Sequence, residues 1–161
     1  TATVSDQETN YWGADKAIDG IVNRDAAKAD QSRWATNQST SQAARTLTVN
    51  LGTQKTFDHF VIEWERTNIT NFKISVCDTE DGEYRDVYVK NDGENITSVT
   101  SDIQLDEAVT AQYVKLTVNG YTVNPGSWQS VSLYEFEILG EAENLSTAAT
   151  ATADGLSLIH I

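Results

Sequence analysis

The 161-residue sequence is short of several residue types, and each shortage excludes a class of structure or chemistry. A single cysteine, Cys77, excludes an internal disulfide, and its place in the strand-like run 72–77 favours a packed thiol over a nucleophile. His59 is the only imidazole suited to a catalytic pair, and no serine lies in a Gly-x-Ser-x-Gly elbow. We therefore expect a binding domain rather than an enzyme.

Basic residues are also scarce. Lysine and arginine number 11 against 24 aspartates and glutamates, which gives a net charge of -13. Because phosphate groups are bound mainly by lysine and arginine, this balance excludes nucleic acid and anionic lipid as expected partners and suits neutral ligands and divalent cations. No apolar run approaches the roughly 18–20 residues of a membrane helix, so we expect no membrane insertion.

The two ends of the sequence indicate a fragment of a longer protein. The chain has no methionine and no export signal, so Thr1 is expected to be the edge of a domain. Residues 142–155 form a linker rich in Thr and Ala, and residues 156–161 match an in-frame reading of CTGTCTCTTATACACATC, which resembles a sequencing-adapter end. Our hypothesis is that these last residues are adapter read-through on a truncated metagenomic gene, which leaves residues 1–141 as the domain.

Alternation of apolar and polar residues is the dominant pattern of the sequence. It runs through the segments 46–51, 59–65, 72–76, 87–89, 103–105, 114–118 and 134–138. Val87 and Val89 are expected to share one face of the fourth segment, and only residues 23–30 read as helix-like. Turn-forming pairs such as Asp81-Gly82 separate the segments. Short strands at this spacing predict an all-β sandwich or barrel with jelly-roll connections.

Two parts of the domain, far apart in sequence, carry oxygen-rich side chains. Residues 15–20 and 32–37 contain Asp19 and Ser32, and the alternating segment 132–140 contains Glu135. Ca²⁺ prefers about six to eight oxygen ligands, which a turn supplies through backbone carbonyls and a few carboxylates. The pair predicts a calcium-bound loop closing onto a strand; the alternative is that Asp19 caps a turn and Glu135 is solvated.

The order of several motifs resembles the discoidin or coagulation-factor type C domain. The motifs are Ala-Ile-Asp-Gly at 17–20, Ser-Arg-Trp at 32–34, Leu-Thr-Val-Asn-Leu-Gly at 47–52, Phe-Lys-Ile-Ser-Val at 72–76, and the segments 81–82, 113–116 and 133–140. Within that superfamily the chain is most similar to bacterial family 32 carbohydrate-binding modules. The eukaryotic branch usually joins the ends of the domain by a disulfide, which a lone Cys77 cannot supply.

The resemblance covers residues 1 to about 141. It implies a discoidin-like jelly-roll β-sandwich of five-stranded and three-stranded antiparallel sheets, with a structural calcium. It also implies a monomeric module attached to a secreted bacterial glycoside hydrolase, outside the cell or at its surface. The expected function is to hold that enzyme on glycans with galactose- or amino-sugar-type residues. The alternative is an adhesion or protein-binding domain of a cell-surface protein.

By position, the resemblance also implies a calcium ligand set. Its members are the Lys16 carbonyl, the Asp19 carboxylate, the Ser32 hydroxyl and carbonyl, the Tyr134 carbonyl and the Glu135 carboxylate, with Glu137 as the alternative to Glu135. The stretch from Gly20 to Ser32 is longer than the family's usual turn. A further ligand is therefore expected from Asn23, Asp25 or Asp30, of which Asp30 is favoured.

A sugar site needs an exposed aromatic ring beside fixed polar groups. Trp34 and Trp64 lie in strand-like patterns and are expected in the core, whereas Trp128 and Trp12 lie in loops. We expect Trp128 to be the main platform and Trp12 a weaker one.

The expected polar groups of the sugar site follow two strand-like segments. Arg66 ends the segment 59–65, where the family places a sugar-binding arginine, and its guanidinium fork can bind neighbouring hydroxyls. The alternative for Arg66 is a salt bridge to Glu63 or Glu65. Asn37 and Gln38, just past Trp34, match a loop where many family members place a sugar-contacting residue.

Overall fold

The computed structural model describes residues 1–38, 43–123 and 129–140. Its strands are β1 (Ala2–Val4), β2 (Trp34–Ala35), β3 (Arg45–Trp64), β4 (Ile69–Cys77), β5 (Arg85–Lys90), β6 (Thr100–Tyr121) and β7 (Ser132–Leu139). Two short 3-10 turns, η1 (Ala14–Ala17) and η2 (Lys28–Asp30), are the only helical elements of the described residues. The all-β prediction is confirmed. The helix-like reading of 23–30 was wrong except for the single turn η2.

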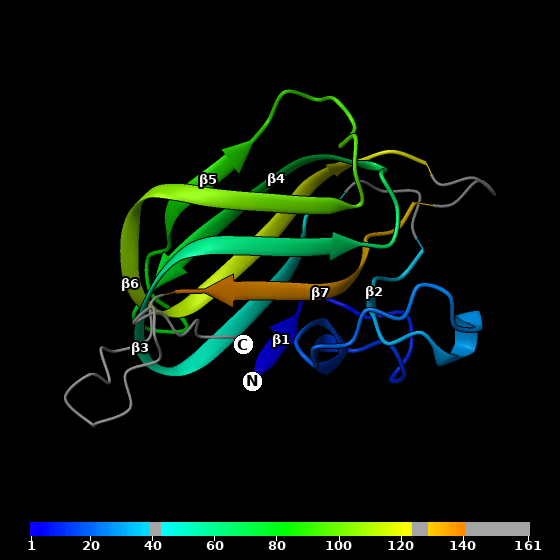
Figure 1. Ribbon diagram of the computed structural model, residues 1–161, viewed down its shortest axis with the longest axis horizontal. Coiled ribbons are helices and arrows are strands. Elements are labelled where there is room, and N and C mark those ends of the chain that lie inside the picture. The colour runs from blue at the N-terminus through cyan, green and yellow to red at the C-terminus, as the bar shows by residue number, and fades with distance from the viewer. Residues whose placement is uncertain (39–42, 124–128, 141–161) are drawn as a thin grey trace, which may run out of the picture.

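Two long strands build both layers of the fold. The sequence predicts separate strands at 46–51 and 59–65, and again at 103–105 and 114–118, but each pair is one strand, β3 or β6. These two strands pair antiparallel from Arg45↔Val118 to Glu63↔Thr100, with shifts of register between Asn50 and Lys55 and between Phe57 and His59. Figure 1 shows both strands bending at the same end of the molecule, so that their two halves lie in different layers. At this bend Gly52 has φ 87°, which is unstrained for glycine alone.

The strand pairings give the expected five-plus-three arrangement within the described residues. One layer contains β1, the first half of β3, the second half of β6, β4 and β5. The other contains the first half of β6, the second half of β3 and β7, with the two-residue β2 at its edge. All strands are antiparallel and belong to one hydrogen-bonded sheet because β3 and β6 run through both layers.

The core lies between the two layers. Its large side chains are the alternating apolar residues of the strands, including the predicted Trp34 and Trp64, both fully buried. Trp64 stacks edge-on against Phe72, with 5.4 Å between ring centroids. The expectation for β5 holds for Val87, which packs against the core, but was wrong for Val89, which is exposed, and Tyr88 packs on Phe72 instead. The strand β7 is buried on both faces over most of its length, and the loop after η1 contacts it through the hydrogen bond from Gly20 to Glu135.

None of the helical turns in the described ranges is long or apolar enough to cross a membrane.

Candidate functional site

The loop that follows η1 closes onto the middle of β7. The backbone N–H of Gly20 donates to Glu135 Oε2 at 2.8 Å, across 115 residues of sequence. The hydroxyl of Ser32 donates to the Asp19 carboxylate, and the other oxygen of that carboxylate accepts from the N–H of Ile21 at 2.9 Å. The predicted ligands Asp19, Ser32 and Glu135 therefore lie at one place, as expected for a loop held to a terminal strand.

Glu135 is in an unusual environment for a carboxylate. It is fully buried, and one oxygen, Oε1, has no hydrogen-bond partner among the described residues. Burial raises the pKa of Glu135 to about 8, the N–H of Gly20 opposes this, and the nearby charges of Asp19 and Glu137 add to the rise in pKa. A buried carboxylate with an unpaired oxygen is costly, and a cation bound between Asp19 and Glu135 would satisfy that oxygen and offset both negative charges.

A bulge in β7 lies at Tyr134, whose carbonyl is one of the predicted calcium ligands. Glu135 pairs with Glu63 and Leu133 pairs with Trp64, so Tyr134 is the extra residue in this strand. The neighbouring strand β2 pairs only with Ser132 and Leu133. Because the extra residue of a bulge is left out of the ladder, the Tyr134 carbonyl is a suitable additional ligand next to Glu135.

The remaining predicted metal residues lie around the same loop. Lys16 is in η1, and its side chain lies 4.0 Å from the carboxylate of Asp15. Asp30 is exposed at the end of η2 and lines the same hollow as Ser32. Asn23, rather than Asp30, makes the direct contact with Ser32, because its side-chain oxygen accepts from the Ser32 N–H at 2.8 Å.

Within the described ranges no group of three or more His, Cys, Asp or Glu side chains is placed to hold a metal. A metal at this loop would therefore depend on two carboxylates, a hydroxyl and backbone carbonyls. That donor set is all oxygen, which fits Ca²⁺ better than a transition metal. The buried Glu135 Oε1, which has no hydrogen-bond partner among the described residues, is a suitable acceptor for such an ion.

Among the described residues, the predicted sugar-binding Arg66 and Asn37 lie on neighbouring segments at the end of the sandwich where β3 ends and β7 begins. The Thr36 N–H donates to the Val131 carbonyl, and the Val131 N–H donates to the Thr36 hydroxyl, which joins the segment after β2 to the one before β7. Asn68 donates to the carbonyls of Thr122 and Ser130 at 3.1 Å each, which fixes the loop after Arg66. The structure thus brings the Arg66 loop close to the segment that leads to Asn37.

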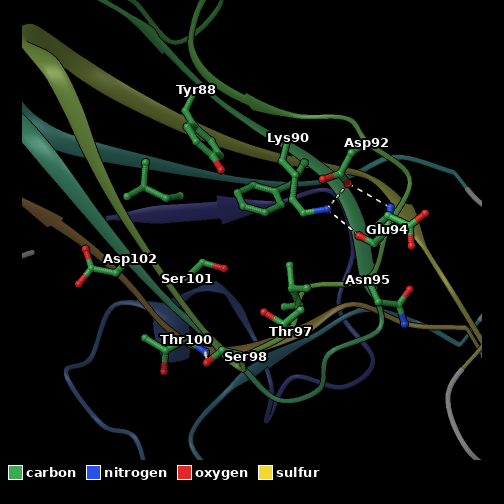
Figure 2. A pocket seen from close by; sticks show the side chains of 13 residues that line it. Tyr88, Lys90, Asp92, Glu94, Asn95, Thr97, Ser98, Thr100, Ser101 and Asp102 are labelled. Carbon is green, nitrogen blue, oxygen red and sulfur yellow. Dashed lines mark hydrogen bonds and ion pairs between the residues drawn. The ribbon is translucent and has the colours of Figure 1, made fainter.

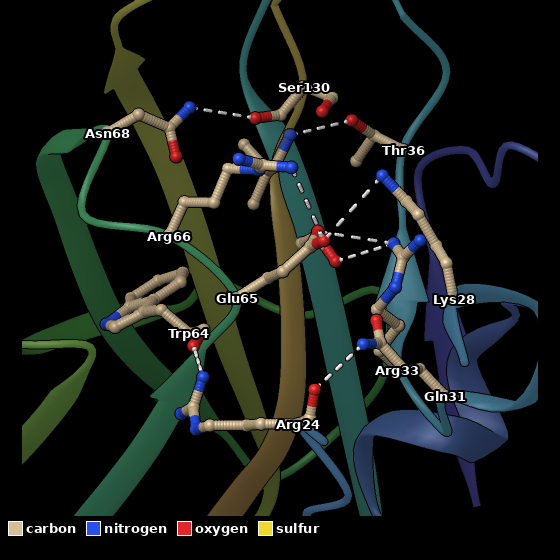
Figure 3. Close-up of polar contacts among 12 residues, drawn as sticks. Arg24, Lys28, Gln31, Arg33, Thr36, Trp64, Glu65, Arg66, Asn68 and Ser130 are labelled. Carbon is tan, nitrogen blue, oxygen red and sulfur yellow. Dashed lines mark hydrogen bonds and ion pairs between the residues drawn. The ribbon is translucent and has the colours of Figure 1, made fainter. Parts of the chain in front are cut away.

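Arg66 belongs to a group of basic side chains around Glu65, which also includes Arg33 and Lys28 (Figure 3). Its guanidinium lies 3.8 Å from Glu65 Oε1, so Arg66 forms the salt bridge to Glu65 that was the alternative expectation, at a long distance. Arg33 and Lys28 approach the same carboxylate, at 3.4 and 4.0 Å. Arg33 is buried and lies 4.0 Å above the ring of Trp12.

The other predicted ligand residues are placed unevenly. Asn37 and Gln38 are exposed, and the Asn37 N–H donates to the Asp6 carboxylate at 2.8 Å. Trp12 is half-buried beneath Arg33, and its neighbour Tyr11 is the exposed ring at this point. Trp128, the main predicted platform, lies outside the described residues.

A second hollow lies at the open side of the sandwich, between β5 and the first residues of β6. Figure 2 shows the Tyr88 hydroxyl pointing into it, with Lys90 and Asp92 on one side and Ser101 and Asp102 on the other. Lys90 is held by the Thr70 and Glu94 carbonyls and by Asp92. No predicted site residue lines this hollow.

The sequence analysis did not predict that Lys28 and Arg33 approach Glu65 beside Arg66. Lys28 lies in the long loop after Gly20, and nothing in its local sequence indicates a contact with Glu65, 37 residues away. Arg33 belongs to the Ser-Arg-Trp motif, which could have drawn attention to it.

Fold and site together define a jelly-roll β-sandwich recognition domain, with polar loops at one end and an oxygen-rich loop beside the terminal strand. The chain belongs to the F5/8 type C domain family, whose model matches residues 1–135. No curated protein matches the chain.

Several solved structures share the fold. Chitosan-binding module 1 of a chitosanase/glucanase from Paenibacillus sp. IK-5 is 25% identical, with a TM-score of 0.68 over 87% of this chain and 94% of that one. The family 32 module of C. perfringens NanJ, solved with galactose, is 22% identical (TM-score 0.63; 86% and 91% covered). CpGH89CBM32-5 of Clostridium perfringens, solved with GalNAc-beta-1,3-galactose, is 19% identical (TM-score 0.62; 86% and 93% covered).

Proposed function

We propose that this domain is a non-catalytic carbohydrate-binding module whose ligand site is the loop end that carries Arg66. The observation that carries the proposal is the half-exposed Arg66 guanidinium on a loop fixed by Asn68. The similarity to a whole chitosan-binding module supports it, because that module is covered over 94% of its length. Structural neighbours that were solved with sugars support it further.

In the intact protein the module holds a linked glycoside hydrolase on its glycan. It acts as a monomer outside a bacterial cell or at its surface. A single shallow site of this kind binds with a dissociation constant of about 1 μM to 1 mM, which is roughly −8 to −4 kcal/mol. Further modules in the same protein raise the overall avidity.

We also propose that Ca²⁺ is a structural cofactor. Asp19, Ser32 and Glu135 would hold it with their side chains, and Lys16 and Tyr134 with their carbonyls. When bound, the ion supplies positive charge between two carboxylates. The chain's own part is to bring the loop after η1 onto β7, which the contact between Gly20 and Glu135 already does. The unpaired Glu135 Oε1 is the observation that supports this cofactor.

A glycan array followed by titration calorimetry tests the ligand site. Arg66→Ala should lower affinity for the best glycan by roughly tenfold or more, because a hydrogen bond to a charged group contributes about 1.5–3 kcal/mol. Trp128→Ala, which removes the predicted platform, should lower it as well. Tyr88→Ala in the second hollow is the control and should bind like the unmodified domain.

Two results would overturn this assignment. A blank array would remove the carbohydrate-binding function. Loss of binding in Tyr88→Ala, with Arg66→Ala unaffected, would move the site to the open side of the sandwich.

A further inference from the structure

Positive charge gathers at one place on this acidic domain. Of the chain's 11 basic residues, Arg24, Lys28, Arg33 and Arg66 lie beside the last residues of β3, where they pair with Glu63 or Glu65. Arg24 is matched by Glu63 at 2.8 Å. We define the cationic cluster as the other basic residues of this group, Lys28, Arg33 and Arg66, which surround Glu65.

The three side chains of the cationic cluster approach one carboxylate, that of Glu65. The nitrogen–oxygen distances to Glu65 are 3.4 Å for Arg33, 3.8 Å for Arg66 and 4.0 Å for Lys28. Each is longer than the roughly 2.7–2.9 Å of a charge-assisted hydrogen bond. Glu65 is thus shared between cations and lies within a charge-assisted hydrogen bond of none of them, and its single negative charge does not offset the two positive charges of Arg33 and Arg66.

The cluster has a fixed base and an accessible surface. The Arg33 side chain is 2% exposed, and it is held by the Trp12 ring at 4.0 Å and by Ser132 Oγ at 3.0 Å. The side chains of Arg66 and Lys28 are 34% and 57% exposed. A buried cation is screened less than exposed ones, so Arg33 adds to the positive potential where Arg66 and Lys28 meet solvent.

The geometry points to an acidic sugar as the ligand of this site: a glycan residue whose carboxylate or sulfate binds the Arg66 guanidinium beside Lys28. This inference rests on the proposed carbohydrate-binding function and narrows it to a class of glycan. The planar guanidinium fork matches the two oxygens of a carboxylate or sulfate. An amino sugar would place its ammonium among like charges, so the chain is expected to differ here from the chitosan-binding module.

Matched oligosaccharides provide the test. Calorimetry would compare trigalacturonate, its methyl ester, galactose 6-sulfate, galactose and chitotriose on the whole chain. The methyl ester keeps the size and ring of the acid but removes its charge. The acid, the sulfate or both should bind roughly tenfold or more tighter than their neutral counterparts. This ratio should shrink when NaCl is raised from about 0.02 to about 0.5 M, since the Debye length falls severalfold.

Three variants locate the effect. Arg66→Gln should remove most of the preference for the acid over its ester, and Lys28→Gln should reduce it. Lys73→Gln removes the same charge from β4, outside the cluster, and should leave the ratio unchanged. Thermal melting of each variant shows whether it is folded.

The outcomes separate this inference from the proposed function. Preference for galactose or chitotriose, or an acid-to-ester ratio unaltered in both cluster variants, overturns the acidic ligand and leaves the carbohydrate-binding function intact. Tight binding of only the uronate or only the sulfate identifies the source of the charge. Absence of binding to these sugars and to the whole array overturns both.

Discussion

Glu135 shows how strongly one side chain can depend on its surroundings. Its carboxylate is enclosed by the loop after η1, and one of its oxygens is unpaired. A cation at this point would bind the folded state and not the unfolded state, and would therefore stabilise the fold. Removal of Ca²⁺ by EDTA should therefore lower the melting temperature of the domain by several degrees. A ligand at a hundred times its dissociation constant contributes about 2.7 kcal/mol to stability.

Glu135→Gln should abolish this response to EDTA, because the amide keeps the shape of the carboxylate and loses its charge. Glu137→Gln is the matched control, since Glu137 lies two residues along β7 and should keep the response. The comparison uses melting curves with and without chelator. Should Glu137→Gln lose the response while Glu135→Gln retains it, the alternative ligand would be the correct one.

Asp86 is the opposite case, an exposed carboxylate held in its charged form. The Ser75 hydroxyl at 2.7 Å, and after it Lys73, lower the pKa of Asp86. A pKa lowered in the fold means that the unfolded chain binds more protons between the two pKa values. The contribution to stability is therefore present above about pH 4 and is lost as pH falls through the folded pKa.

Ser75→Ala should raise the pKa of Asp86 toward its ordinary value, because the first cause of the shift is removed. NMR titration of the Asp86 carboxyl carbon measures this directly. Lys73→Gln removes the second cause and should give a smaller change. An unaltered Asp86 pKa in Ser75→Ala would show that the hydroxyl is not the main cause.

At the scale of elements, the end of β7 is packed closely against the bend in β3. A Cβ added at Gly140 would overlap the Thr56 carbonyl oxygen and the Phe57 Cα, both of which are backbone atoms. Backbone atoms cannot move aside as a side chain can. Gly140→Ala should therefore cost about 1–3 kcal/mol or more by overpacking.

Gly52→Ala is the comparison for Gly140→Ala. At Gly52 there is open space for a Cβ, but φ is +87°, so the expected cost is the roughly 1–2 kcal/mol of a left-handed conformation. Urea unfolding midpoints rank the two variants. A milder effect for Gly140→Ala than for Gly52→Ala would mean that β7 can shift away from β3.

The whole domain is connected by the two strands that pass through both layers. Because β3 and β6 contribute to each layer, neither layer can unfold while the other keeps its pairing partners intact. We expect one cooperative transition in urea. The fluorescence of buried Trp34 and Trp64 and the far-UV circular dichroism should change at the same midpoint. Two separated midpoints would show that the layers unfold independently.

The sequence alone determined most of the strand-forming segments, most of their inward faces and the family. Side chains alternate across a strand with a period of two, so local sequence is enough to place Phe60, Ile62 and Trp64 in the core. The motif order identified the domain type and the residues Asp19, Ser32 and Glu135, which the fold does bring together.

Only the tertiary structure decided the features that depend on residues far apart in the chain. The continuity of β3 and β6 through a bend, the inward turn of Tyr88 in place of Val89 and the bulge at Tyr134 result from pairing with other strands. The cationic cluster is of the same kind, because Lys28 and Glu65 meet through folding and not through sequence spacing. Local sequence patterns do not predict such contacts, because the contacts form only when distant segments pack together.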